Sequence, residues 1–220
     1  MMKNSGNSFN WELFNRMPII GILRDIRIED AKIIVPLYVQ AGFTNIEITI
    51  NSEGAETSIH RLVQEFGTKV NIGAGTVLDL LDLKKALNAG ANFIVTPSTD
   101  EEVIRACAKE GIPIFPGAFT PTEIVKAWQL GATMVKVFPA EQLGLDYIKA
   151  LKAPLKQIKL LPTGGIYIGN VREYFHAGVH GLGISSGLFP SQLIRDKDWK
   201  GLGEHLHAFY HTIQDRTKDT

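Results

Sequence analysis

A short apolar run recurs eight times along the chain, and this repeat limits the possible folds more than any other feature. The runs are rich in Ile and Val and follow one another at intervals of about 20–26 residues, enough for one helix and two short loops. Uninterrupted apolar runs are typical of parallel strands buried on both faces of a sheet. They begin at Pro18, Thr44, Val70, Asn92, Pro113, Thr133, Ile158 and Val179.

Amphipathic segments lie between these runs and predict helices, for example over Asp79–Asn88 and Glu101–Lys109. Many of the segments end in a glycine, which stops a helix by taking the left-handed conformation without a Cβ clash. These glycines are Gly42, Gly90, Gly111, Gly131 and Gly178. Eight strand–helix units predict an α/β fold, a (β/α)8 barrel that spans residues 1–220 as one domain. An open doubly wound sheet is the alternative, but such sheets usually have about five or six strands.

Two further helices are expected outside the repeat. Residues 8–16, with three aromatic side chains, predict a short helix that covers the bottom of the barrel. Trp199–Asp215 predicts the last helix.

The composition excludes several classes of function. Lys plus Arg and Asp plus Glu both number 23, so the chain has no net charge and nucleic-acid binding is not expected. No apolar stretch reaches the roughly 18 residues of a membrane span, and residues 1–12 lack the apolar core of a signal peptide. We therefore expect a soluble cytoplasmic protein.

The cysteine and histidine content argues against a metal site. Cys107 is the only cysteine, which excludes an intrachain disulfide and a cysteine-cluster site. None of the six histidines has ligand spacing with a carboxylate neighbour. We expect neither a metal nor another cofactor.

Two charged residues interrupt the apolar runs, and they predict covalent chemistry. Lys136 lies between two valines and Glu47 between two isoleucines. Strand alternation places both side chains inside the barrel, near the C-terminal strand ends where barrel enzymes have their active sites. Burial lowers the pKa of a lysine toward a neutral amine that can attack a carbonyl. The pair predicts an amine nucleophile with a carboxylate acid/base; a structural ion pair is the alternative.

The last two strand ends favour a phosphate site. Thr163-Gly164-Gly165 opens toward a helix expected at about 169–176, and Ser185-Ser186-Gly187 follows the next strand. Glycine lets backbone N–H groups approach an anion, and a helix N-terminus favours negative charge. Turn or capping roles are the alternative for the Gly, Ser and Thr residues, and a surface charge is the alternative for Arg24 at the first strand end.

Together, the strand-end residues resemble the family of class I 2-keto-3-deoxy-6-phosphogluconate (KDPG) aldolases, which includes 4-hydroxy-2-oxoglutarate (KHG) and 6-phosphogalactonate aldolases. The resemblance covers about residues 17–195. The matching motifs are Ile22-Leu23-Arg24, Glu47-Ile48-Thr49, Gly73-Ala74-Gly75-Thr76-Val77, Val95-Thr96-Pro97, Pro116-Gly117, Lys136-Val137-Phe138-Pro139-Ala140-Glu141 and Pro162-Thr163-Gly164-Gly165-Ile166.

The resemblance implies a role for each matching residue. Lys136 would form the Schiff base, and Glu47 would be the acid/base. Thr76 and a basic residue would hold the pyruvyl carboxylate, and Thr163 would meet the substrate hydroxyls. It further implies that Pro97 and Phe138 shape the pocket, that phosphate rests on Gly164, Gly165 and Ser186, and that the protein is a homotrimer.

Two positions, Asn51 and Ser185, depart from the family pattern. Asn51 stands where many phosphogluconate members carry an arginine, and it is closer to the phosphogalactonate branch. Arg24 is available to supply the missing charge. Thr163 matches the phosphogluconate branch instead. Ser185 stands where the family usually has glycine, and a side chain there could alter phosphate affinity.

The sequence thus predicts an aldolase of the Entner–Doudoroff type that cleaves KDPG to pyruvate and glyceraldehyde 3-phosphate. It would also cleave KHG to pyruvate and glyoxylate, and the galactonate epimer is the alternative substrate. The rival classes are a phosphosugar isomerase or epimerase, with Glu47 as the base, and a non-catalytic sugar-phosphate sensor.

Overall fold

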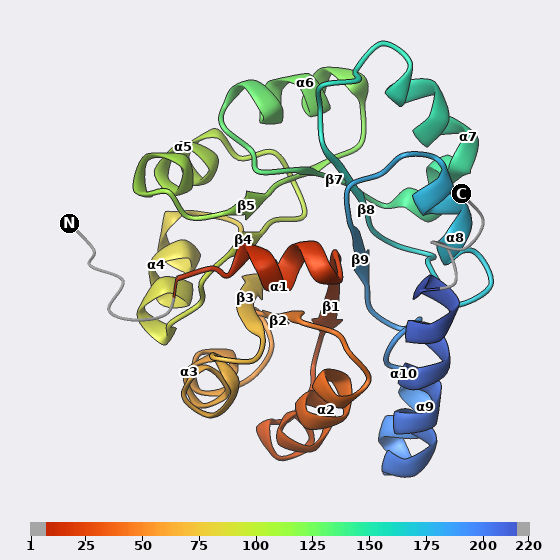
Figure 1. The fold of residues 1–220 in the computed structure, drawn as a ribbon. Helices are drawn as coiled ribbons and strands as arrows, with labels where there is room; N and C mark the ends of the chain where they lie inside the picture. Colours follow the sequence, from red (N-terminus) through yellow and green to blue (C-terminus); the bar gives the residue numbers. More distant parts are fainter. Residues whose placement is uncertain (1–7, 215–220) are drawn as a thin grey trace.

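The computed structural model describes residues 8–214, in which parallel strands are surrounded by helices (Figure 1). The strands are β1 Ile19–Leu23, β2 Asn45–Thr49, β3 Asn71–Gly75, β4 Ile94–Val95, β5 Ile114–Phe115, β6 Gly117–Ala118, β7 Val135–Val137, β8 Leu160–Pro162 and β9 Leu182–Ile184. Six strands pair in the order β5-β4-β3-β2-β1-β9, and three pair in the order β6-β7-β8. The molecule is therefore an α/β protein with a curled parallel sheet.

The two sheets meet at two places. At the first, Pro116 separates β5 from β6, and its carbonyl accepts a hydrogen bond from Lys136 N at 2.8 Å. At the second, Thr163 and Gly183 form an isolated parallel bridge between the end of β8 and β9. The prediction of eight unbroken strands needs correction, because the fifth run is split. Proline has no N–H to donate to a ladder, so pairing stops at Pro116 and resumes beyond it.

The helices are α1 Trp11–Arg16, α2 Ile28–Gln40, α3 Ala55–Phe66, α4 Leu80–Ala89, α5 Glu101–Glu110, α6 Pro121–Gln129, α7 Ala140–Lys152, α8 Val171–His176, α9 Ser191–Arg195 and α10 Trp199–Gln214. The predicted glycine stops are present: the backbone φ angle is 100° at Gly90 and 68° at Gly111. Within residues 8–214, no helix is both long and apolar enough to span a membrane.

Three helix predictions differ in detail from the structure. The helix expected at about 169–176 begins at Val171. The short helix α9 was not predicted. The last helix ends at Gln214, and Asp215 lies outside the described residues.

Helix α1 lies across the end of the strands at which they begin (Figure 1). Its residue Phe14 is buried against Phe115, with ring centroids 5.9 Å apart. Asn10 N donates to Asn71 Oδ1 at 2.8 Å, and Asn71 Nδ2 donates back to Asn10 O at 2.8 Å. The predicted covering helix is therefore present, and it leaves the opposite, C-terminal end of the strands as the place for a site.

Candidate active site

Lys136 occupies the middle of β7, paired with Gly117 on β6 and Leu161 on β8. Only 5% of the residue is exposed. Burial lowers the pKa of its ammonium because the charge loses hydration, and the positive charge of Arg24 lowers it further, whereas the negative charge of Glu47 opposes both. Its Nζ lies 4.9 Å from the centroid of the Phe138 ring. These surroundings favour a neutral, nucleophilic amine.

Glu47 lies on β2, paired with Ile22 and Gly73, and is 2% exposed. Burial raises the pKa of its carboxyl group, although the positive charges of Lys136 and Arg24 oppose that rise. Glu47 Oε1 occupies the space that a Cβ atom on Gly75 would need. Within residues 8–214, Glu47 Oε2 has no hydrogen-bond partner. A buried carboxyl oxygen without a protein partner is suited to exchange protons with a substrate or a water molecule.

Lys136 and Glu47 influence each other's pKa without direct contact. Among the described residues, no ion pair within 4.0 Å includes either of them. The alternative of a structural ion pair is therefore not what the geometry shows. The amine of Lys136 and the carboxylate of Glu47 are therefore more than 4.0 Å apart.

A cavity of about 220 Å³ opens beside Lys136. It brings together seven of the ten predicted site residues, namely Arg24, Lys136, Phe138, Thr163, Gly164, Gly165 and Ser186. Its lining comes from β1, β7 and β9 and from the loop that follows β8, which lie in distant parts of the sequence. Glu47, Thr76 and Pro97 do not line the cavity.

One end of the cavity offers backbone donors. The amides of Gly164, Gly165 and Ser186 donate no hydrogen bond to any described residue. Gly164 and Gly165 have φ angles of 105° and 69°, which only glycine adopts readily. Helix α8 begins six residues after Gly165, so the loop, rather than a helix N-terminus as predicted, supplies donors here.

Thr76 and Pro97 lie outside the cavity, at the ends of neighbouring strands. Thr76 is half-buried and holds a φ angle of 59°, a costly conformation for a β-branched residue. Pro97 is half-buried, and its carbonyl fills the space that a Cβ on Gly117 would need. Asn51 is exposed, just beyond the end of β2.

Five cavity residues were not among the predicted site residues, and one of them, Ser185, was noted only as a departure from the family pattern. Ile22 and Ile166 belong to the matching motifs but carry no polar group, so nothing marked them individually. Gly183 and Ile184 lie on β9. A Cβ on Gly183 would collide with Thr163 Oγ1. A glycine within an apolar strand indicates such a close approach, and this signal could have identified Gly183.

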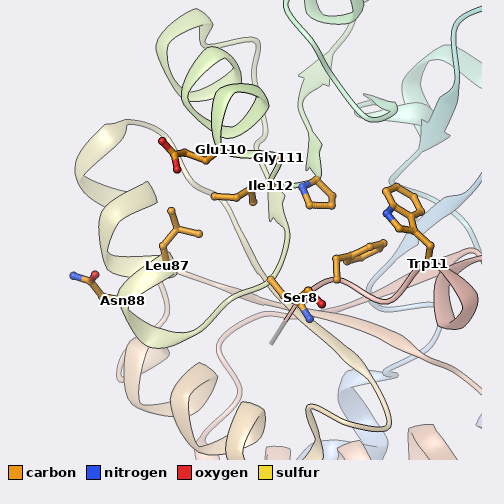
Figure 2. A pocket seen from close by; sticks show the side chains of 10 residues that line it. Ser8, Trp11, Leu87, Asn88, Glu110, Gly111 and Ile112 are labelled. Atoms are coloured by element: carbon orange, nitrogen blue, oxygen red, sulfur yellow. The ribbon is translucent and has the colours of Figure 1, made fainter. Parts of the chain in front are cut away.

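A second cavity, of about 400 Å³, lies at the opposite end of the molecule, beside α1. Figure 2 shows Trp11 on one side of it and Leu87 of α4 on the other. Glu110 is its one titratable lining residue, and no lysine lines it. This cavity therefore lacks the nucleophile and base of the Lys136 site. Across residues 8–214, no group of three or more His, Cys, Asp or Glu side chains is placed to hold a metal ion.

Comparisons with known proteins agree with this geometry. The family model for KDPG and KHG aldolase matches residues 12–204. The chain is 39% identical over 200 residues to a 2-dehydro-3-deoxy-6-phosphogalactonate aldolase of Escherichia coli, covering 90% of this chain and 98% of that protein. It is 35% identical over 191 residues to a 2-dehydro-3-deoxy-phosphogluconate aldolase of Treponema pallidum, covering 86% and 90%.

A solved structure gives the same result. KDPG aldolase from Legionella pneumophila, with pyruvate captured at low pH as a covalent carbinolamine intermediate, has a TM-score of 0.83 and 29% identity. The match covers 90% of this chain and 96% of that one. On these matches, the chain belongs to the KDPG and KHG aldolase family.

Proposed function

We propose that this protein is a Schiff-base aldolase that cleaves KDPG to pyruvate and glyceraldehyde 3-phosphate. The observation that carries the proposal is Lys136, a buried lysine beside a cavity with no carboxylate in direct contact. An isomerase that used Lys136 only as a fixed positive charge would gain nothing from surroundings that lower its pKa. The relative from Legionella pneumophila, which holds pyruvate as a carbinolamine, supports a covalent route.

The reaction would begin when the neutral amine of Lys136 attacks the C2 ketone. Loss of water from the carbinolamine gives a protonated imine, which accepts the electron pair of the breaking C3–C4 bond. Glu47, through a water molecule, would take the proton of the C4 hydroxyl as the aldehyde leaves. It would then return a proton to C3 of the enamine, and water would release pyruvate from Lys136.

The remaining residues would hold the two ends of the substrate. Arg24 and Thr76 would orient the pyruvyl carboxylate, and Thr163 would face the hydroxyl groups. The backbone N–H groups of Gly164, Gly165 and Ser186, which donate to no described residue, would bind the phosphoryl group. They would contribute binding energy away from the reacting bond. Phe138 would shape the pocket directly, since it lines the cavity. Pro97 would shape it indirectly, through the close approach of its carbonyl to Gly117 of β6.

The C4 epimer, 2-keto-3-deoxy-6-phosphogalactonate, is the second candidate substrate. It is favoured by the 39% identity to an aldolase of that name and by the exposed Asn51. Cleavage of KHG to pyruvate and glyoxylate would use the same half-site for pyruvate. Assays of both phosphorylated epimers and of KHG, run side by side, would rank the three.

The test of the covalent route is reductive trapping. Pyruvate with borohydride should modify Lys136 irreversibly, and Lys136→Arg should abolish both the adduct and turnover. The adduct should form equally well in the presence of a chelator, because the imine does the work of a metal ion. Modification of another lysine in the intact protein would contradict the assignment.

The same proposal includes closure of the barrel within the chain and association of the chain into a homotrimer. The junctions at Pro116 and at Thr163–Gly183 support one closed (β/α)8 barrel rather than two separate sheets. The exposed leucines Leu78, Leu80 and Leu81 form an apolar stretch at the start of α4, which supports a homotrimer. Light scattering after size-exclusion chromatography would give the mass of the assembly.

A further inference from the structure

The β1 and β9 strand ends carry two of the proposed anion contacts, yet backbone pairing does not reach them. On one side of β1, pairing with β2 continues to Leu23 and Ile48. On the other side, pairing with β9 stops at Gly21 and Ile184. Arg24 and Ser186 therefore follow a gap between the strands.

A hydrogen bond from a side chain closes this gap. The hydroxyl of Ser185 donates to the carbonyl of Ile22 at 3.2 Å, and both residues line the cavity. The carbonyl of Ser185 in turn accepts from the amides of Leu188 and Phe189, both at 2.9 Å. Ser185 thus connects the end of β1 to the turn that contains Ser186.

The position of this bond in the ladder gives it a second consequence. Leu182 N donates to Pro18 O, and parallel pairing repeats every two residues, so the paired register reaches Ile184 N and Ile20 O. One further step of the ladder would use Ser186 N and Ile22 O. The Ser185 hydroxyl occupies that carbonyl instead. Accordingly, Ser186 N donates to no described residue.

We propose that Ser185 is a positioning residue for the phosphate end of the site. Its hydroxyl satisfies the Ile22 carbonyl in place of the Ser186 amide, which stays available to a phosphoryl oxygen. The inference rests on the proposed function, since it assumes a phosphorylated substrate. Glycine at this position would have no side chain to make the bond.

The test compares two aldehyde acceptors in aldol addition with pyruvate, D-glyceraldehyde 3-phosphate and D-glyceraldehyde. In Ser185→Ala, the Ser186 amide should turn to Ile22 O and be lost to the ligand. KM for the phosphorylated acceptor should rise about 10-fold, the lower end for a hydrogen bond to a charged group. Kinetics with D-glyceraldehyde and pyruvate trapping at Lys136 should stay unchanged, and Ser185→Thr should restore the preference.

A second measurement separates positioning from simple loosening. Hydrogen exchange at the Ser186 amide should slow in Ser185→Ala, because that amide gains a partner, whereas a merely weakened turn would exchange faster. The matched control is Thr44→Val, which deletes another hydroxyl-to-carbonyl bond, from Thr44 Oγ1 to Leu13 O at 2.7 Å, at the opposite end of the strands. It should lower stability and keep the acceptor preference.

The outcomes distinguish this inference from the proposed function. If the wild-type enzyme prefers the phosphorylated acceptor and Ser185→Ala keeps that preference, the positioning role is wrong. Faster exchange at Ser186 in this variant would also overturn it. A wild-type enzyme that forms no imine, or that treats both acceptors alike, would overturn the proposed function and this inference with it.

Discussion

Lys136 is under the influence of two charges of opposite sign, and neither contacts it as an ion pair among the described residues. The carboxylate of Glu47 raises the pKa of the Lys136 ammonium, and the guanidinium of Arg24 lowers it, on top of the larger lowering caused by burial. Imine formation requires the neutral amine, so its rate rises with pH through the pKa of Lys136. Removal of either neighbour should therefore move this pH dependence in a predictable direction.

The first prediction concerns Glu47→Gln. Loss of the negative charge removes the interaction that raises the pKa of Lys136, so half-maximal trapping of pyruvate should occur at lower pH than in the wild type. The imine should still form, while C–C cleavage and proton exchange of pyruvate should fall about 10²–10⁴-fold. Borohydride trapping across a pH series, with turnover measured in parallel, tests both parts. Wild-type proton exchange in this variant would rule out Glu47 as the base.

The second prediction concerns Arg24→Ala and has the opposite sign. Loss of the positive charge removes an interaction that lowers the pKa of Lys136, so trapping should require higher pH. Half-saturation by pyruvate should also need up to about fivefold more ligand, since Arg24 is exposed and a screened charge pair contributes about 1 kcal/mol at most.

The matched control for Arg24 is Arg27→Ala. Arg27 is exposed, pairs with Asp30 and does not line the Lys136 cavity. It should change neither measurement. If Arg24→Ala weakens only phosphorylated ligands and leaves pyruvate trapping untouched, Arg24 serves the phosphate instead of the carboxylate.

At the residue scale, the sequence could predict which charged side chains are buried but not how far apart they lie. Strand alternation is local, so it placed Lys136 and Glu47 inside the protein correctly. Their separation depends on the curvature of the sheet, which no local pattern encodes. The left-handed conformation of Thr76 and the bond from Ser185 to Ile22 were equally inaccessible, because neither follows from a local sequence pattern.

Among the elements, α1 depends on a small network of asparagines. Asn71 Oδ1 accepts a hydrogen bond from Asn10 N. Asn71 Nδ2 donates to both Asn10 O and Asn45 Oδ1, the latter at 2.9 Å. Asn45 Nδ2 continues the network to Met17 O at 2.8 Å. These bonds hold α1 against the start of β2 and β3.

The third prediction is that Asn71→Ala destabilises the fold without changing the chemistry. The substitution leaves the buried Asn45 Oδ1 without its partner, at a cost of about 1–3 kcal/mol, and it also removes both bonds to the exposed Asn10. Urea unfolding should show this loss, while pyruvate trapping at Lys136 stays at the wild-type rate. A loss of trapping in the folded variant would show that the α1 end contributes to the site.

At the element scale, the repeat predicted most of the architecture because both of its signals are local. Apolar runs of Ile and Val marked the strands, and glycines such as Gly90 and Gly111 marked the helix ends. The errors arise where the apolar pattern carries no signal. Pro116 interrupts the ladder although its run is apolar throughout, and α9 is a five-residue helix too short to show a hydrophobic period.

For the molecule as a whole, Cys107 offers a probe of cooperative unfolding. It is fully buried in α5, and burial raises the pKa of its thiol to about 12. Thiol reagents need the thiolate, so the native protein should not react.

The fourth prediction is that an aromatic disulfide reagent labels Cys107 only as fast as the whole molecule unfolds. Labelling rates should follow the global unfolding rate across a urea series, and saturation with pyruvate and borohydride should not speed them. Rapid labelling without urea would show that α5 opens independently of the rest of the fold.

Because Gly75 has no side chain, the evolution of position 75 is coupled to that of Glu47. A methyl group there would occupy the space of the Glu47 carboxyl group, so no lineage can gain a side chain at 75 while the Glu47 side chain stays where it is. Glu47 would have to be replaced first, and on the proposed function activity would be lost with it. Only descendants that have lost catalysis could then gain a side chain at position 75. That side chain would prevent a glutamate from being restored at position 47 in its present conformation.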